Sequence, residues 1–81
     1  MPTVLRWRGY RFYFYSHEPN EPAHVHIDKA ECTAKFWLQP VALARSVGFP
    51  ARELTTLHKR VAENQQALLE AWHGYFGTER G

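Results

Sequence analysis

The stretch from Arg11 to Asp28, RFYFYSHEPNEPAHVHID, decides the fold that we expect for this chain. Phenylalanines alternate with tyrosines in its first part, and aliphatic residues alternate with histidines in its last part. Alternation with a period of two in β-favouring residues is typical of strands that bury one face. The segment between them, His17 to Ala23, contains two prolines, which lack amide donors and favour a loop. We therefore expect two strands, Arg11–Ser16 and His24–Asp28, joined by this loop.

The same alternation occurs on either side of this stretch. Thr3 to Arg8 and Thr33 to Leu38 each place apolar and polar residues on opposite sides of an expected strand. Short connections at Gly9-Tyr10 and at Lys29–Cys32 favour hairpins, and an antiparallel meander is then the simplest topology. Val41 to Val47 is ambiguous between a helical turn and a strand. We expect an antiparallel four-stranded meander sheet, and a fifth short strand at Val41–Val47 is the open alternative.

From Ala51 to Phe76 the spacing of apolar residues becomes helical. Leucines and aromatics recur at intervals of three and four residues, which is typical of a helix with one buried face. We expect this helix to cover one face of the sheet, giving a two-layer α+β fold. A continuous helix over this range would span about 39 Å, whereas a short strand spans only about 20 Å. The helix therefore either breaks near Glu63–Gln66 or extends beyond the sheet. An extending half would expose Leu68, Leu69, Trp72, Tyr75 and Phe76, which a dimer or a partner protein would have to cover.

The alternation also divides the expected sheet into an inner and an outer face. The inner face, beneath the helix, is predicted to carry Leu5, Trp7, Phe12, Phe14, Val25, Ile27, Ala34, Phe36 and Leu38. The outer face, which is the predicted binding surface, carries Arg6, Arg8, Arg11, Tyr13, Tyr15, His24, His26, Lys35 and Trp37. Cations interleaved with aromatic rings suit single-stranded nucleic acid, because bases stack on rings and cations meet phosphates. The alternatives are a surface that packs on a partner protein and an ordinary solvated face.

The pair His24-x-His26 is the sharpest small motif. Residues two apart on a strand project to the same side, so both imidazoles could reach one metal ion, with His17, Glu18, Glu21 or Asp28 adding ligands. No HExxH or CxxC pattern supports zinc, and we expect no metal or other cofactor. The same histidines with Lys35 and Tyr13 are the candidate catalytic residues of a metal-independent ribonuclease, which needs an acid, a base and a cation. Otherwise the histidines are structural and hold the nearby loop, so the sequence leaves open whether the protein is an enzyme.

The composition sets the class of protein. Eighty-one residues, 44% hydrophobic and 22% charged, predict a single globular domain over residues 1–77, followed by a flexible tail at 78–81. Cys32 is the only cysteine, which excludes an internal disulfide and suits a reducing cytoplasm. No apolar stretch approaches the roughly 18–20 residues needed to cross a bilayer. We therefore expect a cytoplasmic protein with no membrane contact.

Three segments carry a resemblance to a known family. The opening MPTVLRWRGYRFYFYSHEPNEPAHVHI, the following AKFWL and the distal GFPARELTTL…LLEAWHGYFG resemble the bacterial domain-of-unknown-function 4160 family. The resemblance implies a small single domain, often encoded beside a protein of the domain-of-unknown-function 2442 family in a toxin–antitoxin-like arrangement. The chain departs from the commonest loop form at Ala23, where a second consecutive proline often occurs. The resemblance implies no catalytic residues.

Three functions follow as hypotheses. The first is a protein-binding component of a toxin–antitoxin-like module that uses the basic-aromatic sheet face or the C-terminal helix. The second is a nucleic-acid-binding regulator, and the third is the small ribonuclease that uses His24 and His26. The expected partners are a second copy of the chain or a small partner protein, with RNA or DNA as the alternative.

Overall fold

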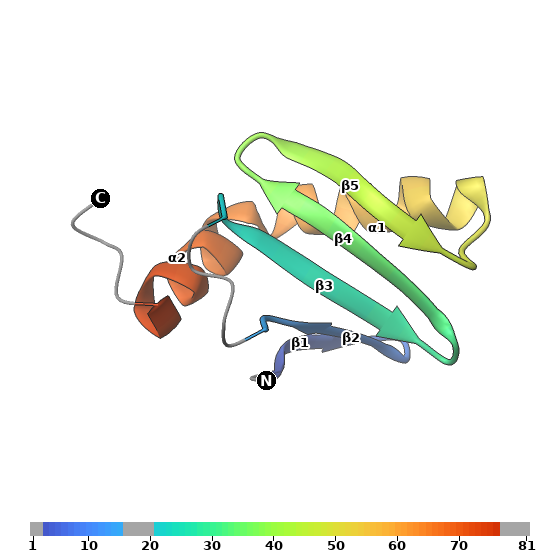
Figure 1. The fold of residues 1–81 in the computed structure, drawn as a ribbon, viewed down its shortest axis with the longest axis horizontal. Coiled ribbons are helices and arrows are strands. Elements are labelled where there is room, and N and C mark those ends of the chain that lie inside the picture. Colours follow the sequence, from blue (N-terminus) through green and yellow to red (C-terminus); the bar gives the residue numbers. More distant parts are fainter. Residues whose placement is uncertain (1–2, 16–20, 77–81) are drawn as a thin grey trace.

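The computed structural model describes residues 3–15 and 21–76 as five strands followed by two helices (Figure 1). The strands are β1 (Thr3–Trp7), β2 (Tyr10–Tyr13), β3 (His24–Lys29), β4 (Cys32–Leu38) and β5 (Val41–Val47). They form one antiparallel sheet in the order β1-β2-β3-β4-β5. The helices are α1 (Ala51–Glu63) and α2 (Gln65–Phe76). The predicted α+β meander is confirmed, and its predicted tail at 78–81 lies outside the described residues. None of the described helices is long and apolar enough to span a membrane.

The sheet has five strands where four were expected. The ambiguous segment Val41–Val47 is a full strand of seven residues that pairs with β4 along its length. A register shift between Lys35 and Phe36 leaves Ala44 unpaired, because Lys35 pairs with Arg45 and Phe36 with Leu43. An extra residue of this kind is a β-bulge, which breaks the period of two. The bulge explains why alternation alone did not identify the segment as a strand.

The first hairpin turns one residue earlier than expected. Trp7 pairs with Tyr10, so Arg8 and Gly9 form a two-residue loop, with φ angles of 52° and 85°. Two positive φ angles in succession match the twist of a tight hairpin. Tyr10 therefore belongs to β2 and is buried, where its hydroxyl donates a hydrogen bond to the carboxylate of Glu53 on α1. Burial and this bond raise the pKa of Tyr10 to about 12.

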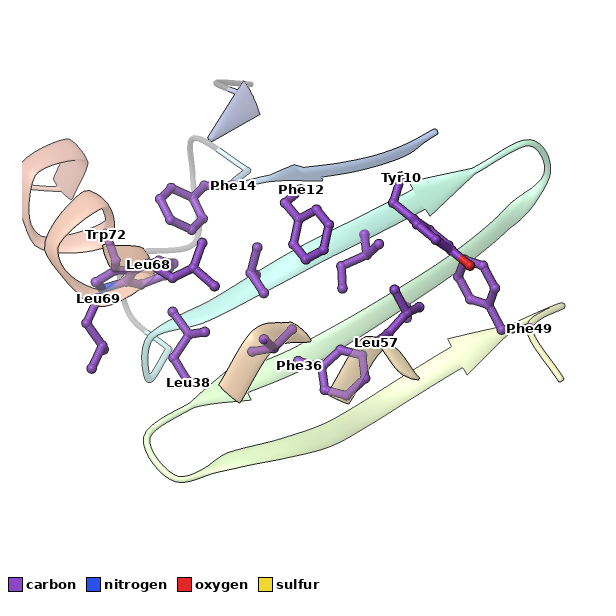
Figure 2. Close-up of a cluster of buried hydrophobic side chains, with 14 residues drawn as sticks. Tyr10, Phe12, Phe14, Phe36, Leu38, Phe49, Leu57, Leu68, Leu69 and Trp72 are labelled. Atoms are coloured by element: carbon purple, nitrogen blue, oxygen red, sulfur yellow. The ribbon is translucent and has the colours of Figure 1, made fainter. Parts of the chain in front are cut away.

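The inner face of the sheet forms the hydrophobic core with the two helices (Figure 2). Its centre is completely buried and consists of Phe12, Phe14, Val25, Ile27, Phe36 and Leu38. Leu57 and Val61 of α1 cover this layer. Leu5 and Trp7 are only partly buried, because β1 is the edge strand of the sheet. The residues predicted for the inner face therefore lie on that face, but those of β1 are less deeply buried than expected.

The helical region bends at Asn64, between α1 and α2. The side-chain amide of Asn64 donates a hydrogen bond to the backbone carbonyl of Arg60 at 2.9 Å. The side-chain amide of Gln65 donates a hydrogen bond to the backbone carbonyl of Leu38 at 2.7 Å, which connects the start of α2 to the end of β4. Leu68, Leu69 and Trp72 are then buried against the end of the chain's own sheet. Of the two alternatives that the sequence left open, the structure shows the break near Glu63–Gln66. Because Leu68, Leu69 and Trp72 are buried within the chain, they no longer argue for a dimer.

We expect Trp72→Ala to lower the free energy of unfolding by about 3–5 kcal/mol, because it empties a packed aromatic site. The Trp72 ring lies 5.3 Å from Phe14 and 4.2 Å from Phe76, measured between ring centroids. Urea unfolding measures the loss, and Tyr75→Ala, at a side chain that is 43% exposed, should cost much less. Equal losses, or a wild-type midpoint that rises with protein concentration, would contradict packing of α2 within one chain.

Candidate functional site

The face of the sheet that points away from α1 brings most of the predicted binding residues together. The register aligns Tyr13 with His26, His26 with Lys35, and Lys35 with Arg45, in a row that crosses β2 to β5. Neighbouring pairs of the same face are Arg6 with Arg11 and His24 with Trp37. We define the outer face as Arg6, Arg11, Tyr13, Tyr15, His24, His26, Lys35, Trp37 and Arg45.

Two residues change place relative to the sequence prediction. Arg8 lies in the β1–β2 turn, and its guanidinium is 5.2 Å from the ring of Trp7, so it is not on the outer face. The alternation suggested otherwise because the strand ends at Trp7, one residue before Arg8. Arg45 on β5 joins the outer face beside Lys35, and sequence reasoning missed it because β5 was not assigned. The only signal for Arg45 was its place in a run of β-favouring residues.

Tyr13 and His26 lie at the centre of the outer face and are deeply buried, with 2% and 3% of their surface exposed. Their rings stack with centroids 5.5 Å apart, and Tyr15 meets His26 edge-on at 4.4 Å. The Tyr13 hydroxyl donates to an Asp28 carboxylate oxygen at 3.0 Å, and the Arg11 guanidinium covers the Tyr13 ring at 4.5 Å. These contacts make an ordered aromatic platform in place of the exposed tyrosine that the sequence suggested.

The pKa of Tyr13 is raised well above its usual value. Burial is the largest cause, followed by the hydrogen bond with Tyr15 and by the bond to Asp28 with its negative charge. Each of these disfavours a phenolate. Tyr13 therefore keeps its proton at neutral pH and is poorly suited to act there as a general base.

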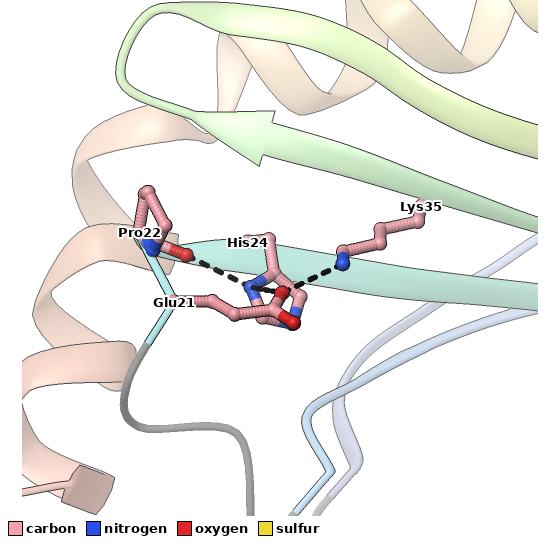
Figure 3. Close-up of polar contacts among 4 residues, drawn as sticks. All are labelled: Glu21, Pro22, His24 and Lys35. Atoms are coloured by element: carbon pink, nitrogen blue, oxygen red, sulfur yellow. Dashed lines mark hydrogen bonds and ion pairs between the residues drawn. The ribbon is translucent and has the colours of Figure 1, made fainter.

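His24 is completely enclosed at the end of the sheet next to α2. Its Nδ1 is 2.8 Å from the Pro22 carbonyl oxygen, so the Nδ1–H donates to that carbonyl (Figure 3). Its ring lies 4.9 Å from Trp72, 5.1 Å from His26 and 5.7 Å from Trp37. His24 thus ties the segment before β3 to the sheet and to α2, in agreement with the structural role considered for the histidines.

Lys35 is engaged by two neighbours on the outer face. Its Nζ is 2.7 Å from a carboxylate oxygen of Glu21 (Figure 3). The same Nζ lies 4.7 Å from the centroid of the Trp37 ring. The same Glu21 oxygen lies 3.8 Å from Nδ1 of His24. The Glu21 side chain is 44% exposed, whereas that of Lys35 is only 12% exposed, so the carboxylate is the partner that solvent reaches more easily.

A hollow of about 250 Å³ opens on the outer face over β3, β4 and β5. It is lined by Tyr15, His26, Thr33, Ala34, Lys35, Arg45, Ser46 and Val47. An imidazole, an ammonium, a guanidinium and hydroxyl groups supply hydrogen-bond donors here, which suits an acidic side chain or a phosphate. Arg45 is exposed, and within the described ranges it forms no ion pair.

The residues considered as metal ligands do not gather in the described part of the chain. Among residues 3–15 and 21–76 no group of three or more His, Cys, Asp or Glu side chains is placed to hold one ion. His17 and Glu18 lie outside the described residues, so the structure describes only His24, His26, Glu21 and Asp28 of the proposed set.

We expect the raised pKa values of Tyr13 and Tyr10 to make stability fall at high pH. Above about pH 10 the unfolded tyrosines lose their protons while these two keep theirs, so the folded state binds more protons and the free energy of unfolding decreases. Tyr13→Phe should flatten this decrease, and the double variant with Tyr10→Phe should flatten it further. Urea unfolding between about pH 9 and 11 measures both slopes. An unchanged slope in Tyr13→Phe would contradict the assigned environment.

Comparison with known proteins gives one assignment. The family described as Domain of unknown function (DUF4160) matches residues 9–73, which include β2 to β5, all of α1 and most of α2. No curated protein and no solved structure gives a significant match. The matched range contains every outer-face residue except Arg6. The chain therefore belongs to the DUF4160 family.

Proposed function

We propose that the protein is a binding component of a bacterial toxin–antitoxin-like module, and that the outer face is its contact surface for a small partner protein. The resemblance to families encoded in pairs motivates the kind of partner. The observation that favours this surface over the C-terminal helix is the burial of α2. Leu68, Leu69 and Trp72 pack within the chain and are not available to a partner. Of the two surfaces expected from the sequence, the outer face is then the better supported.

The chemistry of the outer face supports binding to an acidic protein surface. Arg6 and Arg45 are exposed at its two sides, on β1 and β5, the two edge strands of the sheet. Trp37 and Tyr15 are half-buried between them, anchored by contacts with Lys35 and His26. Arginine, tyrosine and tryptophan are the residues most enriched at the energetic centres of protein interfaces. Aromatic side chains that are already held in place lose little conformational entropy on binding.

We expect the double variant Arg6→Glu/Arg45→Glu to weaken the complex with the neighbouring domain-of-unknown-function 2442 protein by tenfold or more, because two attractive contacts become repulsive. Light scattering after size exclusion should show a complex for the wild type, and calorimetry should show the weakening. Arg52→Glu, which changes an exposed arginine on α1, is the matched control and should bind normally. A wild type that ignores this partner, or equal loss in the control, would contradict the proposal.

A second candidate, nucleic-acid binding by the same face, is favoured by the outer-face hollow. His26, Lys35 and Arg45 line the hollow together, and Trp37 beside Lys35 offers a ring for stacking. A phosphate could take the place of the Glu21 carboxylate on Lys35, because both are oxygen anions and the Glu21 side chain is 44% exposed. Cation contacts to phosphates release counterions when the complex forms.

If this candidate is correct, affinity for single-stranded RNA or DNA should fall steeply as salt is raised. Arg45→Gln should reduce the slope of log affinity against log salt by about one, since one phosphate contact is lost. Fluorescence anisotropy at several salt concentrations measures this slope, with Arg52→Gln as the control. Absence of binding at low salt would exclude nucleic-acid recognition by this face.

The ribonuclease hypothesis has less support from the geometry. Tyr13 retains its proton, and His24 is enclosed and bonded to Pro22, which leaves His26 as the histidine that lines the hollow. An acid and a base would both be needed for transfer from a 2′-hydroxyl. The hypothesis stays a prediction, and its test is RNA cleavage by the wild type that disappears in His26→Ala.

A further inference from the structure

A second basic hollow lies on the other side of the sheet, where the β1–β2 turn meets α1. It measures about 240 Å³ and is lined by Trp7, Arg8, Thr56, Lys59, Arg60 and Glu63. Three cations from two separate elements converge there, against the single carboxylate of Glu63. No outer-face residue lines this hollow, so it is independent of the surface assigned above. We propose that it is a binding site for a phosphate group, in which Arg8, Lys59 and Arg60 are the ligands.

The indole of Trp7 holds two of these cations in position. The Arg60 guanidinium lies 4.1 Å from the centroid of the Trp7 ring, and that of Arg8 lies 5.2 Å from it. Trp7 in turn stacks on Tyr10, with centroids 5.6 Å apart and ring planes inclined by 18°. Guanidinium groups that rest on aromatic rings are pre-organised, so less entropy is lost when they bind an anion. Because Tyr10 and the guanidiniums already contact the indole, the hollow suits a phosphate better than a stacked base.

The Arg60 guanidinium is incompletely satisfied in the described structure. Its Nη1 is 3.6 Å from a Glu63 carboxylate oxygen, which is an ion pair but too long for a hydrogen bond. Its Nε is buried and has no hydrogen-bond partner. Arg8 and Lys59 are exposed, and among residues 3–15 and 21–76 they form no ion pair. The charge of the three cations is therefore available to an incoming anion, as bidentate recognition of phosphate requires.

The backbone of Arg8 gives an independent indication. Arg8 has a φ of 52°, in the left-handed region, where asparagine or glycine is preferred in a tight hairpin turn. An arginine is strained at this position, and strain of this kind concentrates at functional sites. An arginine in this unfavourable conformation is explained if the side chain at this turn must carry a positive charge. It follows that a residue better suited to the turn should stabilise the fold and weaken phosphate binding.

Arg8→Asn tests this opposition directly. We expect its melting temperature to rise by about 2–4 °C, because asparagine tolerates the left-handed conformation. We expect its affinity for a fluorescein-labelled single-stranded RNA to fall about fivefold, and those of Lys59→Gln and Arg60→Gln to fall by a similar factor or more. Arg52→Gln is the control for charge elsewhere on α1. Arg45→Gln reports separately on the outer face. RNA affinity that falls in Arg45→Gln but not in the three hollow variants would assign the RNA to the outer face and overturn the phosphate site.

The probe distinguishes two sources of the phosphate. NMR titration of the Trp7 indole signal with inorganic phosphate detects binding of the free ion, and the RNA measures binding of a backbone phosphate. Displacement of the indole signal by either probe in the wild type, and its loss in Arg8→Asn, supports the site. Failure of both probes to move the signal would overturn the proposal. It would equally be overturned if Arg8→Asn were more stable but bound RNA as tightly as the wild type.

Discussion

The bend at Asn64 is the constraint on which the rest of the structure depends. A small sheet with one apolar face cannot cover a straight helix over Ala51–Phe76, because such a helix would be about twice as long as a strand. The bend and the bond from Gln65 to Leu38 direct α2 across the end of the sheet. Trp72 then meets Phe14 and His24 there. A domain of this size buries only a small hydrophobic core, so the apolar surface that α2 buries contributes substantially to its free energy of unfolding.

The same packing determines which surfaces remain for function. Because α2 buries its leucines and Trp72 internally, the helical layer offers little apolar surface, and Tyr75 is its exposed aromatic. Trp72 also encloses His24, which links the core to the candidate site: the imidazole is held between the helix and the outer face. The outer face consequently presents packed aromatic rings together with the exposed arginines Arg6 and Arg45. The central tyrosine of this face keeps its proton at neutral pH, because its pKa is raised, and it is therefore a poor general base there.

Much of this architecture could be predicted from alternation and helical spacing. The period of two identified four strands and assigned Phe12, Phe14, Val25 and Ile27 to the correct side. It could not identify β5, whose bulge interrupts the pattern, and it therefore missed Arg45. Alternation also gives the side of a residue but not its depth: Tyr13 and His26 belong to the outer face and are nonetheless buried beneath their neighbours. Arg8 was misplaced because the turn begins one residue earlier than its glycine suggested.

The protein carries two basic surfaces on opposite sides of the sheet, which its mild net charge of +2 does not reveal. The outer face combines cations with several packed aromatic rings, as protein interfaces do, whereas the hollow at the first hairpin combines three cations with the single aromatic ring of Trp7. The most direct measurement of the central claim is amide hydrogen exchange of the protein with and without its 2442-family neighbour. The account predicts added protection in β4 and in β5, at the edge of the sheet, and no change in α2. Protection confined to Gln65–Phe76, with β4 and β5 unchanged, would contradict it.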